Sequence, residues 1–211
     1  MWVNKKKIAL SAVEKLKEVY PKAICSLTAD TPFQLIVATR LSAQCTDARV
    51  NLVTPVLFEK FPDPYSMAKA EVGEIEQLIK SCGLYKTKAR DLSKLSKVLV
   101  GEYDGELPKT LEELVKLPGI GRKTANLICG DVYGMPAVVT DTHCIRISGR
   151  LGLTSSKDPK RTELELKKLL PAEESSAFCH RIVMFGRDTC TARNPKCGDC
   201  KLEEFCPKCG L

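Results

Sequence analysis

The sequence contains few histidines and aromatic residues, and it has no long apolar run. There are two histidines, and Phe, Trp and Tyr together make up 6% of 211 residues. No stretch approaches the roughly 18 apolar residues that identify a membrane-spanning helix, so no membrane partner is expected. The basic start, residues 1–7, is not followed by an apolar segment, so no secretory signal is expected. There is also no internal repeat and no Gly/Ser linker, so a domain boundary needs another argument.

Size and charge are those of an ordinary globular protein. Hydrophobic residues make up 44% and charged residues 28%, which excludes disorder for most of the chain. The length suffices for one large or two small domains without disulfides. The net charge of +7 favours an anionic partner where basic residues cluster near other signals.

Apolar periodicity predicts an all-α fold with almost no strand. Thr31 and Pro32 are typical of a helix start, and Pro55 is expected to kink its helix. The extended run at 138–140 is too short to found a sheet. The predicted helices cover residues 8–20, 32–44, 46–60, 71–80, 86–103, 110–117, 122–133, 142–151, 158–170 and 174–188.

Eleven cysteines are a high number for this length. The number is odd and no secretory signal precedes them, so a disulfide framework is not expected. Six are scattered singly and are expected to be small buried residues in a reducing cytoplasm. Five crowd into residues 190–211: Cys190, Cys197, Cys200, Cys206 and Cys209.

Two metal sites compete for this tail. Cys197 and Cys200 with Cys206 and Cys209 form CxxC-x5-CxxC, which could hold zinc, although zinc pairs are usually separated by about 12–20 residues. Alternatively, Cys190, Cys197, Cys200 and Cys206 ligate a [4Fe–4S] cluster, which a compact irregular loop can enclose. The spacing favours the iron–sulfur cluster, and Cys209 is then a spare thiol.

A glycine turn joins two predicted helices at residues 117–125, LPGIGRKTA. Gly119 and Gly121 allow unusual dihedrals and close approach to another backbone. The amides that follow, with Arg122 beside them, form a natural phosphate site. Lys123 stands in the first helical turn, where the helix dipole disfavours a cation. It is either a phosphate contact or, as a neutral amine, a nucleophile.

Asp141 follows where the extended segment turns into a helix. It is an N-cap residue, a functional carboxylate that balances the lysine's charge, or both. His143 is expected to pack or hydrogen-bond at the helix start, since no second histidine stands near it as a metal ligand.

These motifs together resemble the endonuclease III family of DNA repair glycosylases. The residues concerned are LSAQCTD at 41–47, LPGIGRKTAN at 117–126, VTDTH at 139–143 and the four-cysteine tail at 190–206. The resemblance implies a helix-hairpin-helix glycosylase fold. It places a six-helix domain at 22–135 and an iron–sulfur cluster domain at 1–21 plus 136–211.

The resemblance also implies a bifunctional DNA glycosylase and AP lyase acting on oxidised pyrimidines flipped out of duplex DNA. Lys123 matches the nucleophile that forms a Schiff base at C1′, before β-elimination cuts the strand 3′ to the lesion. Asp141 matches the carboxylate that assists base departure. Gln44 matches a residue that fills the hole in the duplex, and Leu84 looks like the opposite wedge.

Further contacts follow from the same resemblance. Gly119, Gly121 and Arg122 would hold the DNA backbone, and Arg193 and Lys196 would form a basic edge of the cysteine loop. The implied protein is a prokaryotic, cytoplasmic monomer that associates with the nucleoid through DNA.

Two other functions compete with this one. One is a non-catalytic, zinc-containing DNA-binding module. The other is a monofunctional mismatch glycosylase, although the adenine- and thymine-mismatch relatives generally lack lysine at position 123.

Overall fold

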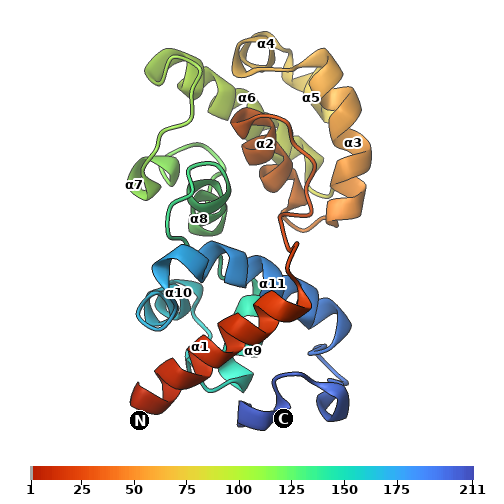
Figure 1. Ribbon diagram of the computed structural model, residues 1–211. Coiled ribbons are helices and arrows are strands. Elements are labelled where there is room, and N and C mark those ends of the chain that lie inside the picture. Colours follow the sequence, from red (N-terminus) through yellow and green to blue (C-terminus); the bar gives the residue numbers. More distant parts are fainter. Residues whose placement is uncertain (1) are drawn as a thin grey trace. The chain divides into compact units, whose positions relative to one another are not determined.

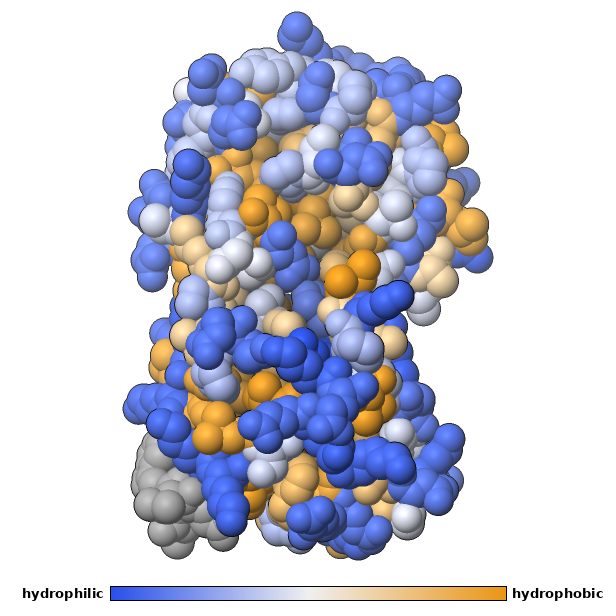
Figure 2. All heavy atoms as spheres, in the orientation of Figure 1, coloured by the Kyte–Doolittle hydropathy of each residue, from blue (hydrophilic) through white to orange (hydrophobic). Residues whose placement is uncertain are grey.

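The computed structural model describes residues 2–211, with side chains from residue 5 onward, and it divides into two compact units (Figure 1). The described part of the chain is helical and contains no strand, which confirms the predicted all-α class. None of its helices is long and apolar enough to cross a membrane. On the visible face of each unit, hydrophilic side chains surround smaller apolar areas (Figure 2).

One unit is continuous and spans residues 26–133. Its core includes Ile36 and Leu41 from one helix and Leu92, Leu95 and Leu99 from another, all fully buried. Its helices are α2 (Pro32–Ser42), α3 (Asp47–Lys60), α4 (Pro64–Lys69), α5 (Val72–Leu78), α6 (Tyr85–Glu102), α7 (Leu111–Leu114) and α8 (Arg122–Asp131).

The other unit is built from residues up to 25 and from residues 134–211. The predicted domain limit of 22–135 lies close to these bounds, but as the limit of an independently folding domain it stays a prediction. The α-helices of this unit are α1 (Trp2–Val19), α9 (Thr142–Arg150), α10 (Pro159–Lys167) and α11 (Ser175–Asp188). Its 3-10 turns are η1 (Ala172–Glu174), η2 (Cys197–Asp199) and η3 (Glu203–Phe205).

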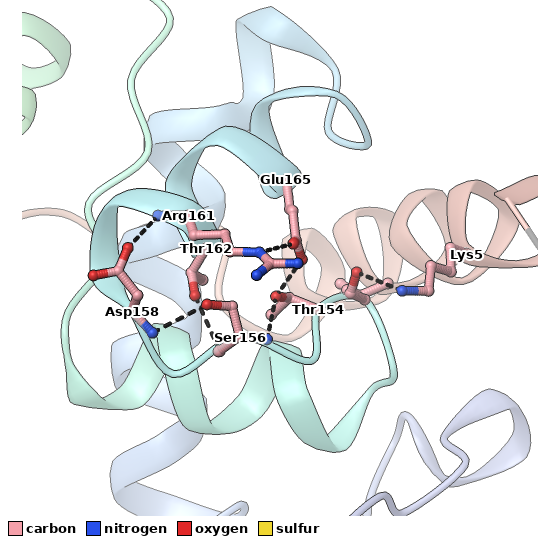
Figure 3. A network of polar contacts seen from close by, with 8 residues as sticks. Lys5, Thr154, Ser156, Asp158, Arg161, Thr162 and Glu165 are labelled. Atoms are coloured by element: carbon pink, nitrogen blue, oxygen red, sulfur yellow. Dashed lines mark hydrogen bonds and ion pairs between the residues drawn. The ribbon is translucent and has the colours of Figure 1, made fainter.

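A polar network fixes the segment between α9 and α10 (Figure 3). Thr154 lies at its centre, because its hydroxyl donates to Glu165 and accepts from the Ser156 amide. The hydrogen bond from Thr154 is the main cause that holds the pKa of Glu165 below its usual value. The outer members are Lys5, which donates to the Leu153 carbonyl, and Asp158, Arg161 and Thr162 at the start of α10.

Two details of the sequence prediction were wrong. Helix α4 was not predicted, although Asp63 and Ser66 form a capping box around Pro64. Helix α1 begins six residues earlier than the predicted start at residue 8.

Candidate active site

The glycine turn lies between α7 and α8, and its tip packs against an ion pair. Gly119 has a φ of +74°, and a Cβ there would lie 2.8 Å from both the Arg40 Nε and the Asp91 Cβ. Arg40 of α2 donates to the Asp91 carboxylate of α6 over 2.5 Å between Nη2 and Oδ2. Only glycine fits both this dihedral and this contact, so the turn is fixed by α2 and α6.

Gly121 is different, and the expectation that it too adopts an unusual dihedral was wrong. Its φ is −93°, and no atom lies within 4 Å of where a Cβ would stand. It is the N-cap residue of α8 and has no side chain to satisfy the first amides of the helix. The positive end of α8 is therefore open to an anion from outside.

Lys123 is the second residue of α8 and is exposed. Ala125 and Ile128 lie on the opposite side of the helix and are fully buried. The structure thus presents the lysine amine to solvent directly after the fixed turn, where a ligand can reach it.

Asp141 is the N-cap residue of α9, as one of the two sequence interpretations predicted. Its Oδ1 accepts a hydrogen bond of 2.7 Å from the Cys144 amide, and its side chain is partly exposed. His143 contacts Arg146 over 3.2 Å and packs on α11, where a Cβ on Gly186 would lie 2.4 Å from its Nδ1. The carboxylate is therefore positioned by the first turn of a helix that packs closely on α11.

Gln44 and Leu84 lie on neighbouring loops in the same unit. Gln44 is exposed with a φ of 55°, and Leu84 is 58% exposed with a φ of 58° immediately before α6. A Cβ on Gly83 would lie 3.3 Å from the Gln44 carbonyl oxygen, so the two backbones touch. Left-handed dihedrals at such residues cost roughly 1–3 kcal/mol each and cluster at functional sites.

A buried lysine lies beneath these loops, and sequence reasoning missed it. Lys88 is fully buried and donates a 2.8 Å hydrogen bond to the Leu41 carbonyl near the end of α2. Burial lowers the pKa of its amine. The available signal was its position four residues before Leu92 and seven before Leu95, on the apolar face of α6.

Four cysteines of the tail line one pocket with apolar walls. A backbone amide at Leu202 donates to the Cys200 sulfur over 3.4 Å, and the Arg150 guanidinium donates to the Cys190 sulfur over 3.3 Å. Burial raises the pKa of Cys200 and Cys206, and the neighbouring thiols raise it further. The pocket is lined by Cys190, Cys197, Cys200 and Cys206 together with Ile147, Leu151, Phe185 and Leu202 among others.

This pocket fits a cluster better than a single ion. Among the described residues, no three His, Cys, Asp or Glu side chains lie close enough to hold one metal ion. Thiolates around a [4Fe–4S] cluster stand farther apart, and hydrogen bonds to sulfur and an apolar shell are common features of such sites.

Arg150 also fixes the loop itself, and it is a second residue that sequence reasoning missed. It is 8% exposed and donates to the carbonyls of Thr191 and Ala192 over 2.7 and 2.9 Å. Arg193 and Lys196 are exposed on this loop. Cys209 is exposed, and its amide donates to the Arg150 carbonyl over 3.1 Å.

Comparison with known proteins decides the family. The family model described as HhH-GPD superfamily base excision DNA repair protein matches residues 37–172. Endonuclease III of Synechocystis sp. is 48% identical over 97% of this chain and 94% of its own length. The chain belongs to the endonuclease III family. Endonuclease III of Bacillus subtilis is 45% identical over 92% of this chain and 89% of its own, and that of Escherichia coli K12 is 36% identical over 97% and 96%.

Solved structures agree with this membership. A trapped endonuclease III–DNA covalent intermediate and a non-covalent endonuclease III–DNA complex each match with a TM-score of 0.91 and 43% identity. Each match covers 96% of this chain and 96% or 95% of the other. A thermostable thymine-DNA glycosylase, at 22% identity and a TM-score of 0.85, shares the fold.

Family membership answers two questions that the sequence left open. The iron–sulfur binding domain of endonuclease III matches residues 190–206, so the tail holds a [4Fe–4S] cluster rather than zinc. Cys209 lies outside this match, in agreement with its interpretation as a spare thiol. This member of the family is an enzyme of base excision DNA repair, a DNA glycosylase/AP lyase, and its partner is DNA.

Proposed function

We propose that this enzyme removes oxidised pyrimidines from duplex DNA and then cuts the strand 3′ to the abasic site. The observation that carries the proposal is Lys123, exposed on the first turn of α8 directly after the fixed glycine turn. A lysine amine at this position is what separates a bifunctional enzyme from one that only releases the base. A relative's structure titled as a trapped covalent DNA intermediate supports a covalent step.

The chemistry proceeds in two steps. The Lys123 amine attacks C1′ while the bond between C1′ and the base breaks, and the base leaves with the bonding electrons and takes up a proton. The C1′–O4′ bond then breaks as the nitrogen lone pair forms the C1′=Nζ double bond of a Schiff base, and O4′ takes up the proton that the lysine nitrogen releases. Loss of a proton from C2′ then expels the 3′ phosphate by β-elimination.

Asp141 is the proposed carboxylate that assists base departure. Its Oδ1 bond to the Cys144 amide holds the side chain at the N-terminus of α9. A carboxylate with one fixed geometry stabilises the positive charge that develops on the sugar as the base leaves.

Gln44 and Leu84 are the proposed residues that replace the extruded nucleotide. Extruding a base costs a few kcal/mol of stacking and pairing, so the vacated space needs a side chain to fill it. Both residues are exposed at the tips of touching loops and held in left-handed dihedrals. This arrangement supports a role for the Gln44 amide in reading a base edge and a role for the Leu84 side chain as an apolar wedge beside it.

The proposed DNA backbone contacts are the glycine turn and the cysteine loop. The open flank of Gly121 leaves room for a phosphate at the positive end of α8, with Gly119 and Arg122 beside it. Arg193 and Lys196 add positive charge on the loop. Ligation of the cluster by Cys190, Cys197, Cys200 and Cys206 would keep this loop rigid. The proposed role of the cluster is structural, because neither base removal nor elimination needs an electron.

We further propose that the enzyme acts as a monomer in the cytoplasm of a prokaryote, on the nucleoid.

Borohydride trapping on a duplex with one oxidised pyrimidine tests the proposal. Wild type gives a covalent protein–DNA band, and Lys123→Ala gives none. Lys116→Ala, which removes an exposed amine from the α7–α8 connection, is the matched control and keeps the band. A band from Lys123→Ala contradicts the nucleophile. A band on a pre-formed abasic site alone contradicts the lesion class and leaves the lyase step intact.

A further inference from the structure

Two thiols flank the contact between the loops of Gln44 and Leu84. Cys45 follows Gln44, and Cys82 precedes Gly83, whose Cβ position is 3.3 Å from the Gln44 carbonyl. The Cys45 thiol lies close enough to the Cys82 thiol to raise its pKa. Cys45 is partly exposed, whereas Cys82 is fully buried. The pair therefore has one sulfur that solvent reaches and one that it does not.

Lys88 supplies a cation to this pair. Its amine is fully buried, is bound to the Leu41 carbonyl, and is close enough to interact electrostatically with both thiols. Its charge opposes the rise in the pKa of the Cys82 thiol that burial causes, and the thiolate is the form that reacts in thiol–disulfide chemistry.

We propose that Cys45 and Cys82 are a redox-active dithiol that hydroperoxides convert into a disulfide, which joins the loops of Gln44 and Leu84. The effect on activity rests on the function proposed above for these two residues. The disulfide itself depends only on the two thiols.

The oxidation balances with one peroxide per pair. The Cys45 thiolate attacks a peroxide oxygen, so an S–O bond forms, the O–O bond breaks, and the hydroxide released takes up a proton to become water. Cys82 then attacks the Cys45 sulfur, so the S–S bond forms, the S–O bond breaks, and a second water leaves with the Cys82 proton. Two thiols and one hydrogen peroxide thus give one disulfide and two waters.

The electrostatics of the pair favour this order. Burial and, after it, the neighbouring Cys45 thiol raise the pKa of Cys82 to about 11. Oxidation of Cys45 removes its negative charge, so Cys82 ionises more readily at the moment when it has to attack. Cys144 and Cys179 are a second pair of neighbouring thiols, but they are 1% and 3% exposed, so neither can be the first to react.

The disulfide alters the loops that carry the wedge. Its S–S length of about 2.05 Å is well below the closest approach of two sulfurs that are not bonded, so the loops are drawn together and joined. Gln44 and Leu84 stand one and two residues from the bond. They can then no longer adjust independently to a duplex.

Mass spectrometry of the peroxide-treated holoenzyme tests the dithiol. We expect a cross-linked peptide pair containing Cys45 and Cys82 after the remaining thiols are alkylated. Cys82→Ser should stop at a sulfenic acid on Cys45 that dimedone traps, and Cys45→Ala should give neither product. Cys25→Ala, which lacks a partly exposed thiol elsewhere, is the matched control and should cross-link like wild type. Oxidation of Cys45 in wild type without the cross-link overturns the proposal, and so does a cross-link between other cysteines only.

Strand cleavage tests the consequence. We expect the cross-linked wild type to cut a duplex with one oxidised pyrimidine at least tenfold more slowly, and dithiothreitol to restore the rate. Cys45→Ala, treated in parallel with the cluster's visible absorbance monitored, should keep its rate. Equal loss in both proteins assigns the effect to the cluster and overturns the loop mechanism. A reduced wild type that does not cleave contradicts the proposed function, whereas a missing cross-link contradicts the dithiol, so the two failures are distinguishable.

Discussion

The two glycines of the turn offer a matched pair of substitutions with opposite expected results. Gly119→Ala puts a methyl group 2.8 Å from Arg40 Nε and Asp91 Cβ at a φ of +74°. The left-handed dihedral costs an alanine roughly 1–2 kcal/mol, and the forced displacement of packed groups adds about 1–3 kcal/mol. The free energy of unfolding should therefore fall by about 2–5 kcal/mol, which lowers the Tm by roughly 4–20 °C for a chain of this size.

Gly121→Ala meets no atom within 4 Å and keeps an ordinary φ of −93°. Its stability should stay within about 1 kcal/mol of wild type. Its affinity for duplex DNA should fall severalfold, because the methyl group occupies the space proposed for a phosphate. Thermal unfolding followed by circular dichroism and titration of a labelled duplex measure the two effects. A Tm for Gly119→Ala equal to that of wild type would refute the steric argument. Equal DNA affinity for Gly121→Ala would refute the phosphate site.

Substitutions at three further positions test particular hydrogen bonds. Arg150→Leu removes the hydrogen bonds to the Cys190 sulfur and to two loop carbonyls, so the cluster should be lost faster. The decay of the cluster's visible absorbance in the presence of a chelator measures this loss, and an unchanged decay rate contradicts the role of Arg150. Asp141→Asn keeps an amide oxygen that can cap the helix, so its Tm should stay near that of wild type while the rate of base excision falls at least tenfold. Asp141→Ala loses the cap as well, so its free energy of unfolding should also fall by about 1 kcal/mol. Tyr20 donates to Asp188, and burial raises its pKa to about 12. Unfolded Tyr20 ionises near pH 10 and the folded residue only near pH 12, so stability should fall across this window, and Tyr20→Phe should flatten that part of the pH profile.

Much of the helical framework could be predicted from local signals. Thr31 caps α2 through the Gln34 amide, and Asp141 caps α9 through Cys144, as their positions before apolar runs indicated. Helix α4 escaped notice because its six residues bury only Pro64 and Met67, too few to show a period. Cysteine spacing favoured the correct cofactor, since ligand spacing is a local property of the chain.

The candidate site was less visible in the sequence. Leucine and glutamine rarely adopt left-handed dihedrals, so no local sequence signal predicts the backbone conformations of Leu84 and Gln44. The family resemblance singled them out. Lys88 and Arg150 were missed because a charged residue on an apolar face normally reaches solvent. Their burial depends on carbonyls supplied by segments distant in sequence, Leu41 for one and the cysteine loop for the other.

The discontinuous unit has a consequence for synthesis of the protein. Helix α1 packs against α11, which is translated more than 150 residues later. The apolar residues of α1 can therefore be buried only after α11 has been made; they include Ala9, Val13 and Leu16. The unit at 26–133 emerges complete in the meantime and can fold first, as domains generally do on the ribosome. Loading of the cluster must come later still, because the cysteine loop follows α11. A ribosome stalled before residue 190 would therefore carry a finished glycine turn but no cluster.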